Sequence, residues 1–127
     1  MKPQKAKKIL AAHNIDESVD FAYAMNDSLI LIIYTANRFV VALDDEHIHF
    51  VQISLIREKP KQYFKIPVSA FETIDITGVI VRIGIKSEFA SEYGESLNFD
   101  VPIISLRMTE YQKKFRQQLK ILKENLI

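Results

Sequence analysis

The sequence has no cysteine, which excludes disulfide bonds and thiolate metal sites. Its three glycines, at positions 78, 84 and 94, are too few and too widely spaced for a glycine-rich loop that holds phosphate groups. No serine stands in a Gly-x-Ser-x-Gly motif, so a serine nucleophile of that kind is excluded as well. Because these familiar signatures of enzymes are missing, we expect a non-enzymatic protein without a cofactor.

Long hydrophobic runs are missing too. The longest, Leu-Ile-Leu-Ile-Ile-Tyr at 29–34, is far below the roughly 20 residues that a membrane-spanning helix needs. The apolar stretch 9–12 is too short for the core of a signal peptide. With 127 residues, 48% of them hydrophobic, the chain is long enough to form one domain over 1–127 with a core of its own. We therefore expect a soluble, cytoplasmic, single-domain protein.

The charge is unevenly distributed, although its net value is only +1. Residues 1–8 carry four lysines and no acid, and residues 107–127 carry six basic groups against two acids. The part between them is acidic, apart from a short basic stretch at 57–65. Both ends of the chain are therefore basic, and its middle is acidic.

The first segment has the hydrophobic spacing of one helix face. Ala6, Ile9, Leu10 and His13 follow the i, i+3, i+4, i+7 pattern. Asn14 can end such a helix in the left-handed conformation, with the next residue packing back on the helix. The pattern predicts a short helix within 1–14.

From residue 17 the hydrophobic period changes to two, which indicates strands with one buried face. We predict strands at 17–25, 28–35, 38–43, 47–58, 63–66, 79–86 and 96–101, with 71–76 continuing the strand at 63–66. The connections between them are short and none has the length of a helix, so the sheet should be antiparallel. Together they predict a barrel of about seven antiparallel strands over 17–103.

The chain ends in an amphipathic helix, predicted over 109–126. Its hydrophobic positions form one stripe, made of Tyr111, Phe115, Leu119, Leu122 and Leu126. Thr109 and Gln112 have the spacing of a capping box at its start. The stripe must be buried, and the sheet is the only available partner, so we expect Phe115 and Leu119 to pack against the sheet.

This layout resembles the pleckstrin-homology (PH) superfold. Within "LILIIYTANRFVVAL", Thr35 and Arg38 stand on either side of a turn, as in bacterial PH-like domains. The segment "YFKIPVSAFETIDI" is similar to their I-P-x-S-x-I segment and the strand after it, with matching residues at Ile66, Pro67, Ser69, Phe71 and Ile74. The N-terminal helix fits one bacterial subgroup. The resemblance implies a mainly β (α+β) open barrel capped by the C-terminal helix, and a module that binds lipids, peptides or proteins.

Two histidines two residues apart, His47 and His49, follow three consecutive acids. Side chains at this spacing on a strand face the same side, so with Asp44, Asp45 or Glu46 they could bind zinc or copper. The alternative is a tight turn followed by a solvent-exposed strand face. We expect the turn and the exposed face, with a metal-dependent function centred on these histidines as the rival hypothesis.

One face of the C-terminal helix is basic. Lys113, Arg116, Lys120 and Lys123 fall within about an 80° arc opposite the apolar stripe. Basic residues near the C-terminal end of a helix also interact favourably with the helix dipole, whether or not a partner binds. The alternative is therefore an ordinary solvent-exposed face. If this face binds, it would meet an anionic membrane surface, nucleic acid or an acidic protein, and all four side chains should lie on the solvent side.

The remaining expectations concern partners. In eukaryotic phosphoinositide binders of this superfold, the turn after the first strand carries Lys and Arg, whereas here it reads Met-Asn-Asp-Ser at 25–28. That departure argues against a phosphoinositide site at this turn. We see no nucleic-acid motif, and therefore do not expect nucleic acid. A protein or peptide partner is the main hypothesis, with self-association through an exposed strand edge as a further possibility.

Overall fold

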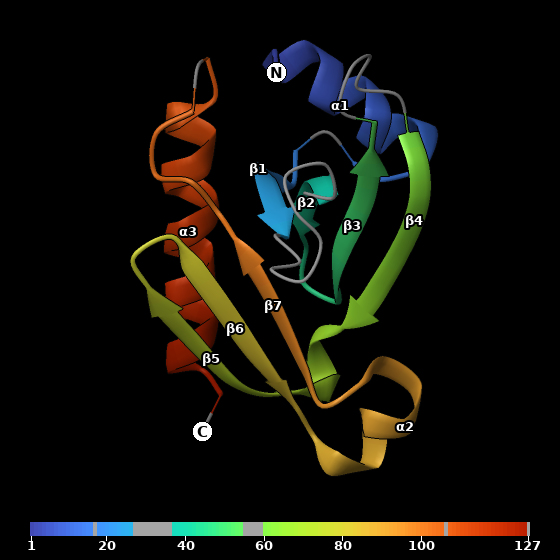
Figure 1. Ribbon diagram of the computed structural model, residues 1–127, viewed down its shortest axis with the longest axis vertical. Coiled ribbons are helices and arrows are strands. Elements are labelled where there is room, and N and C mark those ends of the chain that lie inside the picture. The colour runs from blue at the N-terminus through green and yellow to red at the C-terminus, as the bar shows by residue number, and fades with distance from the viewer. Residues whose placement is uncertain (17, 27–36, 55–59, 106, 127) are drawn as a thin grey trace.

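The computed structural model describes residues 1–127 except 17, 27–36, 55–59, 106 and 127, and shows a curved sheet with helices packed on it (Figure 1). In chain order the longer elements are α1 (Pro3–Ala12), β1 (Asp20–Asn26), β2 (Asn37–Leu43), β3 (His47–Ile53), β4 (Pro60–Pro67), β5 (Phe71–Thr77), β6 (Ile80–Ile85), β7 (Ser96–Asp100) and α3 (Thr109–Glu124). Three short helices complete them: η1 (Val68–Ala70), η2 (Ser87–Phe89) and α2 (Ala90–Tyr93).

The seven strands form one antiparallel sheet in the order β4-β3-β2-β1-β7-β6-β5. Two meanders, β1 to β4 and β5 to β7, meet where β1 lies beside β7. Among the described residues, that junction is a single residue pair, Met25 with Asp100. The two halves of the sheet therefore diverge from this point, and Figure 1 shows α3 along the β5–β7 half and α1 at one end of the β1–β4 half. The predicted fold of about seven antiparallel strands with a helix at each end is confirmed.

The end of α1 has the predicted geometry. Asn14 adopts a φ of 60°, in the left-handed region. The backbone N–H of Ile15 donates to the carbonyl oxygen of Leu10, and that of Asn14 donates to Ala11, both at 3.0 Å. This pair of bonds is the Schellman motif, which satisfies helix carbonyls that would otherwise lack partners. It also turns the chain so that Ile15 is buried beside Leu10.

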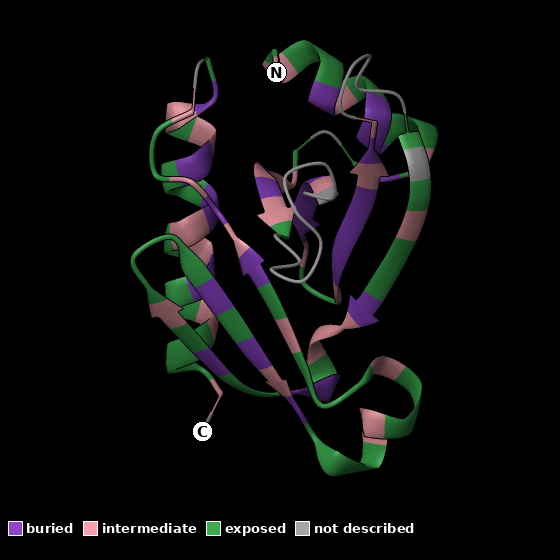
Figure 2. Cartoon of the chain, viewed as in Figure 1, coloured by how far each residue is buried: buried purple, intermediate pink, exposed green. Residues whose placement is uncertain are grey.

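Hydrophobic residues are buried on both faces of the sheet (Figure 2). One cluster lies between the two halves and includes Phe71, Ile74, Phe115 and Leu119. The other lies under α1 and includes Leu10. Phe115 and Leu119 have no exposed surface, which confirms that α3 is docked through its apolar stripe.

One strand prediction is wrong and another falls outside the described residues. The segment 71–76 does not continue the strand at 63–66, because β4 and β5 are separate strands at opposite edges of the sheet. Pro67 ends β4, and the turn of η1 redirects the chain, since proline cannot donate to a sheet ladder. The predicted strand at 28–35 lies within 27–36, outside the described residues.

The predicted capping box is also wrong. The N-cap of α3 is Met108 and has no side-chain cap. Thr109 is instead the first residue of the helix, and its side-chain hydroxyl donates to the carbonyl oxygen of Ser105 at 3.0 Å. Gln112 is fully buried, and its amide bonds to β1 and to Pro102. Both side chains that the pattern assigned to the cap therefore bond elsewhere, Thr109 to the preceding turn and Gln112 to a distant strand.

Gly84 on β6 has no room for a side chain, because a Cβ atom there would overlap the hydroxyl oxygen of Thr73 on β5. The register of β5 against β6 shifts between Phe71 and Thr73, which brings Thr73 opposite Gly84. We expect Gly84→Ala to lower the free energy of unfolding by about 1–3 kcal/mol through this steric overlap. Denaturant titration of the purified protein measures the change.

The double variant Gly84→Ala with Thr73→Ala is the control for this prediction. Thr73 is exposed, so Thr73→Ala alone should change stability little. Removing its hydroxyl takes away the overlapping atom, and the double variant should recover most of the loss. A double variant no more stable than Gly84→Ala alone would show that the overlap is not the cause.

Candidate functional site

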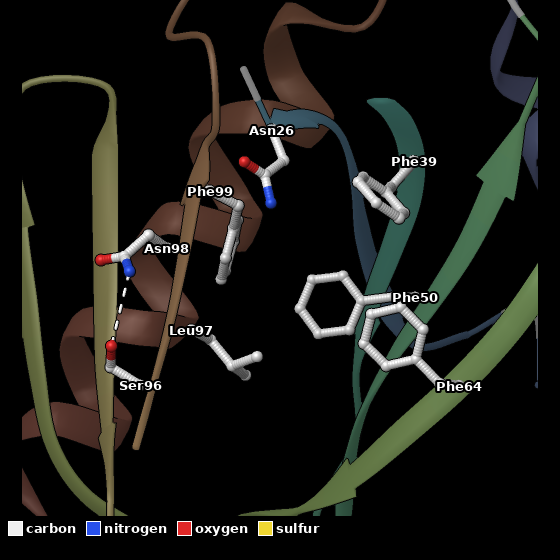
Figure 3. A pocket seen from close by; sticks show the side chains of 8 residues that line it. All are labelled: Asn26, Phe39, Phe50, Phe64, Ser96, Leu97, Asn98 and Phe99. Atoms are coloured by element: carbon white, nitrogen blue, oxygen red, sulfur yellow. Dashed lines mark hydrogen bonds between the residues drawn. The ribbon is translucent and has the colours of Figure 1, made fainter. Parts of the chain in front are cut away.

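A cleft opens between the two halves of the sheet where β1 and β7 diverge. Its volume is about 250 Å³. We call it the phenylalanine cleft, and its lining residues are Asn26, Phe39, Phe50, Phe64, Ser96, Leu97, Asn98 and Phe99. Figure 3 shows three phenylalanine rings from β2, β3 and β4 on one side and the side chains of Leu97 and Phe99 from β7 on the other.

The aromatic wall is a connected cluster. The ring of Phe50 stacks on Phe64 with centroids 4.9 Å apart, and meets Phe99 edge-on at 5.2 Å. Phe39 lies edge-on to Phe50 at 5.9 Å. Three of these four rings are buried, whereas Phe64 is 41% exposed. Since stacked and edge-on rings hold each other in place, the cleft presents an apolar wall that is already formed.

The polar residues of the cleft lie on β7 and at the end of β1. The side-chain oxygen of Asn98 accepts a hydrogen bond from Arg82 on β6 at 2.9 Å, and its amide nitrogen lies 3.4 Å from the hydroxyl of Ser96. Figure 3 shows Asn98 and Ser96 on the side of β7 away from the phenylalanine rings. The cleft therefore has an aromatic wall, and the amide of Asn26 lies between Phe39 and Phe99 at one end of it (Figure 3).

Next to the junction of β1 and β7, a side chain of α3 bonds to the strand backbone. The side chain of Gln112 accepts a hydrogen bond from the backbone N–H of Tyr23 at 2.7 Å and donates to the carbonyl oxygen of Tyr23 at 2.8 Å. It donates a further bond to the carbonyl oxygen of Pro102 at 2.9 Å. The amide of Gln112 thus takes the place that the backbone of a neighbouring strand would occupy beside β1.

The expectation of a solvent-exposed face at His47 and His49 is wrong for His49, which is buried with 6% of its surface exposed. Its Nε2 lies 2.7 Å from a carboxylate oxygen of Asp44, and its Nδ1 lies 2.8 Å from the hydroxyl of Tyr63. His13 of α1 stacks on the same tyrosine ring at 4.7 Å, because the N-terminal helix covers this face of the sheet. The predicted turn before the strand is present.

The polar atoms of this cluster satisfy one another. Because a carboxylate can only accept, Nε2–H of His49 donates to Asp44, and in a neutral imidazole with this proton Nδ1 accepts from the hydroxyl of Tyr63. Burial raises the pKa of Asp44, but the hydrogen bonds from His49 and from the backbone of His47 and Glu46 outweigh it and lower the pKa overall. Burial and the charge of Asp44 raise the pKa of Tyr63.

The metal hypothesis receives no support from this geometry. Both ring nitrogens of His49 already have partners. Across the part of the chain that the structure describes, no group of three or more histidine, aspartate or glutamate side chains could hold a metal ion. Through the Asp44–His49–Tyr63 hydrogen bonds and the stacking of His13 on Tyr63, the cluster instead links the β2–β3 turn, β4 and the end of α1.

The basic face of α3 is present only in part. Lys113, Lys120 and Lys123 are exposed, as expected. Arg116 is not on the solvent side, because it is half-buried and its guanidinium donates to the carbonyl oxygens of Val101 at 3.2 Å and Gly78 at 2.6 Å. The expectation that all four side chains lie on the solvent side is therefore wrong for Arg116, which links α3 to the β5–β6 turn and to the residue that follows β7.

The phenylalanine cleft was not predicted from the sequence. Each of its rings occupies an ordinary buried-face position of a strand, and only the sheet order brings them together. The one local signal is Phe64, which stands between Tyr63 and Lys65 in the sequence.

A scan against protein-family models gives no match, and no curated protein matches the sequence. Among solved structures, the chain is similar to the hSac2 domain from human phosphoinositide phosphatase Sac2, with a TM-score of 0.53 and 11% sequence identity. The similarity covers 98% of this chain and 84% of that one. The shared architecture is a PH-like fold, in agreement with the resemblance noted above. In the described part of the chain, no helix has the length and apolar character needed to cross a bilayer.

Proposed function

We propose that the protein is a non-enzymatic binding module of the bacterial PH-like type, and that a peptide or protein partner binds in the phenylalanine cleft. The observation that supports this most directly is the partly exposed ring of Phe64, stacked on a buried aromatic cluster at the cleft. The helix α1 before the barrel supports the bacterial subgroup. PH-like folds serve mainly as scaffolds for binding sites, which supports a binding role over catalysis.

The dimensions of the cleft favour a side chain of a larger partner over a small-molecule ligand. Its volume of about 250 Å³ lies below the roughly 300–1,000 Å³ of typical small-molecule pockets. Aromatic residues in preformed apolar pockets are also typical of the few positions that dominate protein–protein affinity. A partner that inserts one large apolar side chain would cover Phe64 and remove its exposed surface from water.

A second candidate is binding to an anionic membrane surface. It is supported by the three exposed lysines of α3, Lys113, Lys120 and Lys123. The structural neighbour comes from a protein named as a phosphoinositide phosphatase, which makes lipid headgroups a reasonable class to test. The segment 25–28 carries no basic residue, which weighs against a phosphoinositide site at the turn that the sequence predicts there.

The test is a selection of random peptides displayed on phage against the purified full chain. Peptides that bind in the cleft should carry an aromatic or large aliphatic residue. Their affinity should fall by at least about tenfold on Phe64→Ser, equivalent to about 1.4 kcal/mol. The matched control is Ile121→Ser on α3, because Ile121 is 44% exposed, compared with 41% for Phe64, and lies outside the cleft.

Vesicle binding separates the two candidates. A chain that sediments with vesicles containing anionic lipid at low salt, and loses this on Lys120→Glu with Lys123→Glu, supports the membrane candidate, since exposed charges act through screened electrostatics. Selected peptides that bind equally well to the wild type and Phe64→Ser would contradict a role for the cleft. A purified chain that is dimeric, and becomes monomeric on Phe64→Ser alone, would identify a second copy as the partner.

A further inference from the structure

The two ends of the molecule's long axis carry opposite charge. In Figure 1, where that axis is vertical, α1 and the start of α3 lie at one end and α2 lies at the other. Residues 86–95, which include η2 and α2, carry the exposed acids Glu88, Glu92 and Glu95 against Lys86. The opposite end is basic, and we call it the basic end. It consists of residues 1–12, 103–105 and 107–114.

The helix α1 contributes lysines without any acid. Lys2, directly before the helix, and Lys5 and Lys8 within it are exposed, and Lys7 is half-buried. Residues 1–15 contain no aspartate or glutamate. The buried residues of the helix are all apolar, so every charged side chain of α1 is positive and lies outside its buried face.

The start of α3 lies against α1. The side-chain nitrogen of Lys7 lies 5.8 Å from the centre of the Tyr111 ring. Lys7 and Lys114 line the same pocket, which has a volume of about 210 Å³. Met108, the residue before α3, has no exposed surface and belongs to the same core cluster as Leu10 of α1. Because this contact is buried and close-packed, the two helices present one fixed surface.

Residues 107–114 continue the positive charge, since Arg107, Lys113 and Lys114 are exposed. Nζ of Lys113 lies 3.8 Å from a carboxylate oxygen of Glu110, and Nζ of Lys114 lies 3.6 Å from one of Asp20. Asp16 is a further acid, on the segment between α1 and β1. Ion pairs at the surface are weak, so these lysines remain able to contact another anion.

The loop before α3 adds exposed apolar side chains. Ile104 is 79% exposed, the highest value among the large hydrophobic residues that the structure describes, and Ile103 is 43% exposed. Side chains of α3 bond to the loop on both sides of this pair, at the carbonyl oxygens of Pro102 at 2.9 Å and Ser105 at 3.0 Å. The loop is thus fixed to α3 while its two isoleucines face water at the basic end.

This combination fits the surface of a bilayer that contains anionic lipid. Basic residues are attracted by the negative surface potential of such a bilayer, and exposed apolar residues enter the boundary between headgroups and acyl chains. A nucleic acid would match the charge, but it offers no apolar layer to the two isoleucines. The acids around α2 are repelled by the same surface, so the field also orients the molecule with its basic end toward the bilayer.

We propose that the basic end docks on an anionic bilayer surface. The lysines of α1 and of the start of α3 contact the anionic headgroups, and Ile103 and Ile104 insert among them. One flat surface reaches both helices and the loop, because they lie at the same end of the long axis (Figure 1). The proposal goes beyond the proposed function, since it uses neither the phenylalanine cleft nor Lys120 and Lys123.

The first experiment measures sedimentation of the full chain with vesicles of phosphatidylcholine, with and without phosphatidylserine. The wild type should bind only the vesicles with phosphatidylserine, and less tightly as salt rises. Lys2→Glu with Lys8→Glu should weaken binding by at least about tenfold, because two attractive charges become repulsive. The matched control is Lys120→Glu with Lys123→Glu. It changes the net charge equally, but on the half of α3 away from the basic end, and should weaken binding by less than about threefold.

The second experiment places a fluorescent reporter on the loop. The chain has no tryptophan, so Ile104→Trp introduces a single one. Its fluorescence should shift to shorter wavelength when vesicles with phosphatidylserine are added, and brominated lipids should quench it, because the indole moves from water into the headgroup boundary. Ile121→Trp is the matched control and should show neither change, because Ile121 is exposed as well but lies on the later part of α3.

The outcomes separate this proposal from the proposed function. A loss of vesicle binding on Lys2→Glu with Lys8→Glu but not on the control pair, together with the fluorescence shift at position 104, would support docking at the basic end. Equal losses for the two pairs, a loss for the control pair alone, or no shift at position 104 would overturn it. A chain that binds no vesicles at low salt, whether or not it binds DNA or RNA fragments, would also overturn it. Phe64→Ser should leave vesicle binding unchanged, so its effect on selected peptides tests the cleft separately.

Discussion

Replacing Phe115 by alanine is expected to lower the free energy of unfolding by about 3–5 kcal/mol, which is typical of a fully buried aromatic residue. Phe115 has no exposed surface and belongs to the main core cluster with Leu119 and Phe71. Its ring fixes α3 against the sheet, and the cavity left by alanine could be filled only by moving the helix. Urea or guanidinium denaturation, followed by circular dichroism, measures the loss.

The control for this prediction is Ile121→Ala. Ile121 lies on the same helix but is 44% exposed, so its truncation should cost less than about 1 kcal/mol. Equal midpoints for Phe115→Ala and the wild type would mean that α3 is not docked as described. Equal losses for the two variants would mean that the helix is rotated about its axis.

The second large effect is expected at Gln112, which is fully buried and bonds to the N–H and C=O groups of Tyr23 and to the C=O of Pro102. Gln112→Leu keeps a side chain of similar size but provides neither donor nor acceptor. Each buried polar group left without a partner costs about 1–3 kcal/mol, so we expect a loss of at least about 3 kcal/mol. Thermal or chemical denaturation measures it.

Gln117→Leu is the matched control, because Gln117 is an exposed glutamine on the same helix. That change should stay within about 0.5 kcal/mol, as is usual for surface positions. A Gln112→Leu protein as stable as the control would show that water or a shifted backbone can satisfy Tyr23. In that case α3 would not be what closes the edge of β1.

Much of the fold follows from local patterns. The spacing of Ala6, Ile9 and Leu10 predicts α1, and Asn14 predicts how it ends, because both depend on neighbours within one or two turns. The alternation along β6 and β7 and the apolar stripe of α3 have the same local origin. Hydrophobic periodicity reports which face is buried, and in these elements it did so correctly.

The errors occurred where a residue's partner is distant in sequence. Gln112 and Thr109 have the spacing of a capping box, but Gln112 bonds to Tyr23, 89 positions earlier. Arg116 has the spacing of a solvated basic face, but it bonds to Gly78, 38 positions earlier. His49 was expected on an exposed face, because the pattern of one strand cannot show that a helix covers it. A long polar side chain can either extend into solvent or bond to a distant part of the chain, and its tertiary surroundings decide which.

From the sequence alone, α1, α3, most of the strands, the antiparallel sheet and the PH-like class could be predicted, because each rests on local periodicity or on short connections. The phenylalanine cleft could not. It exists because β7 lies beside β1 and, among the described residues, the two strands pair at a single position before diverging. That placement depends on how two meanders and α3 share one core, which is a balance of packing over the whole chain that no short segment encodes.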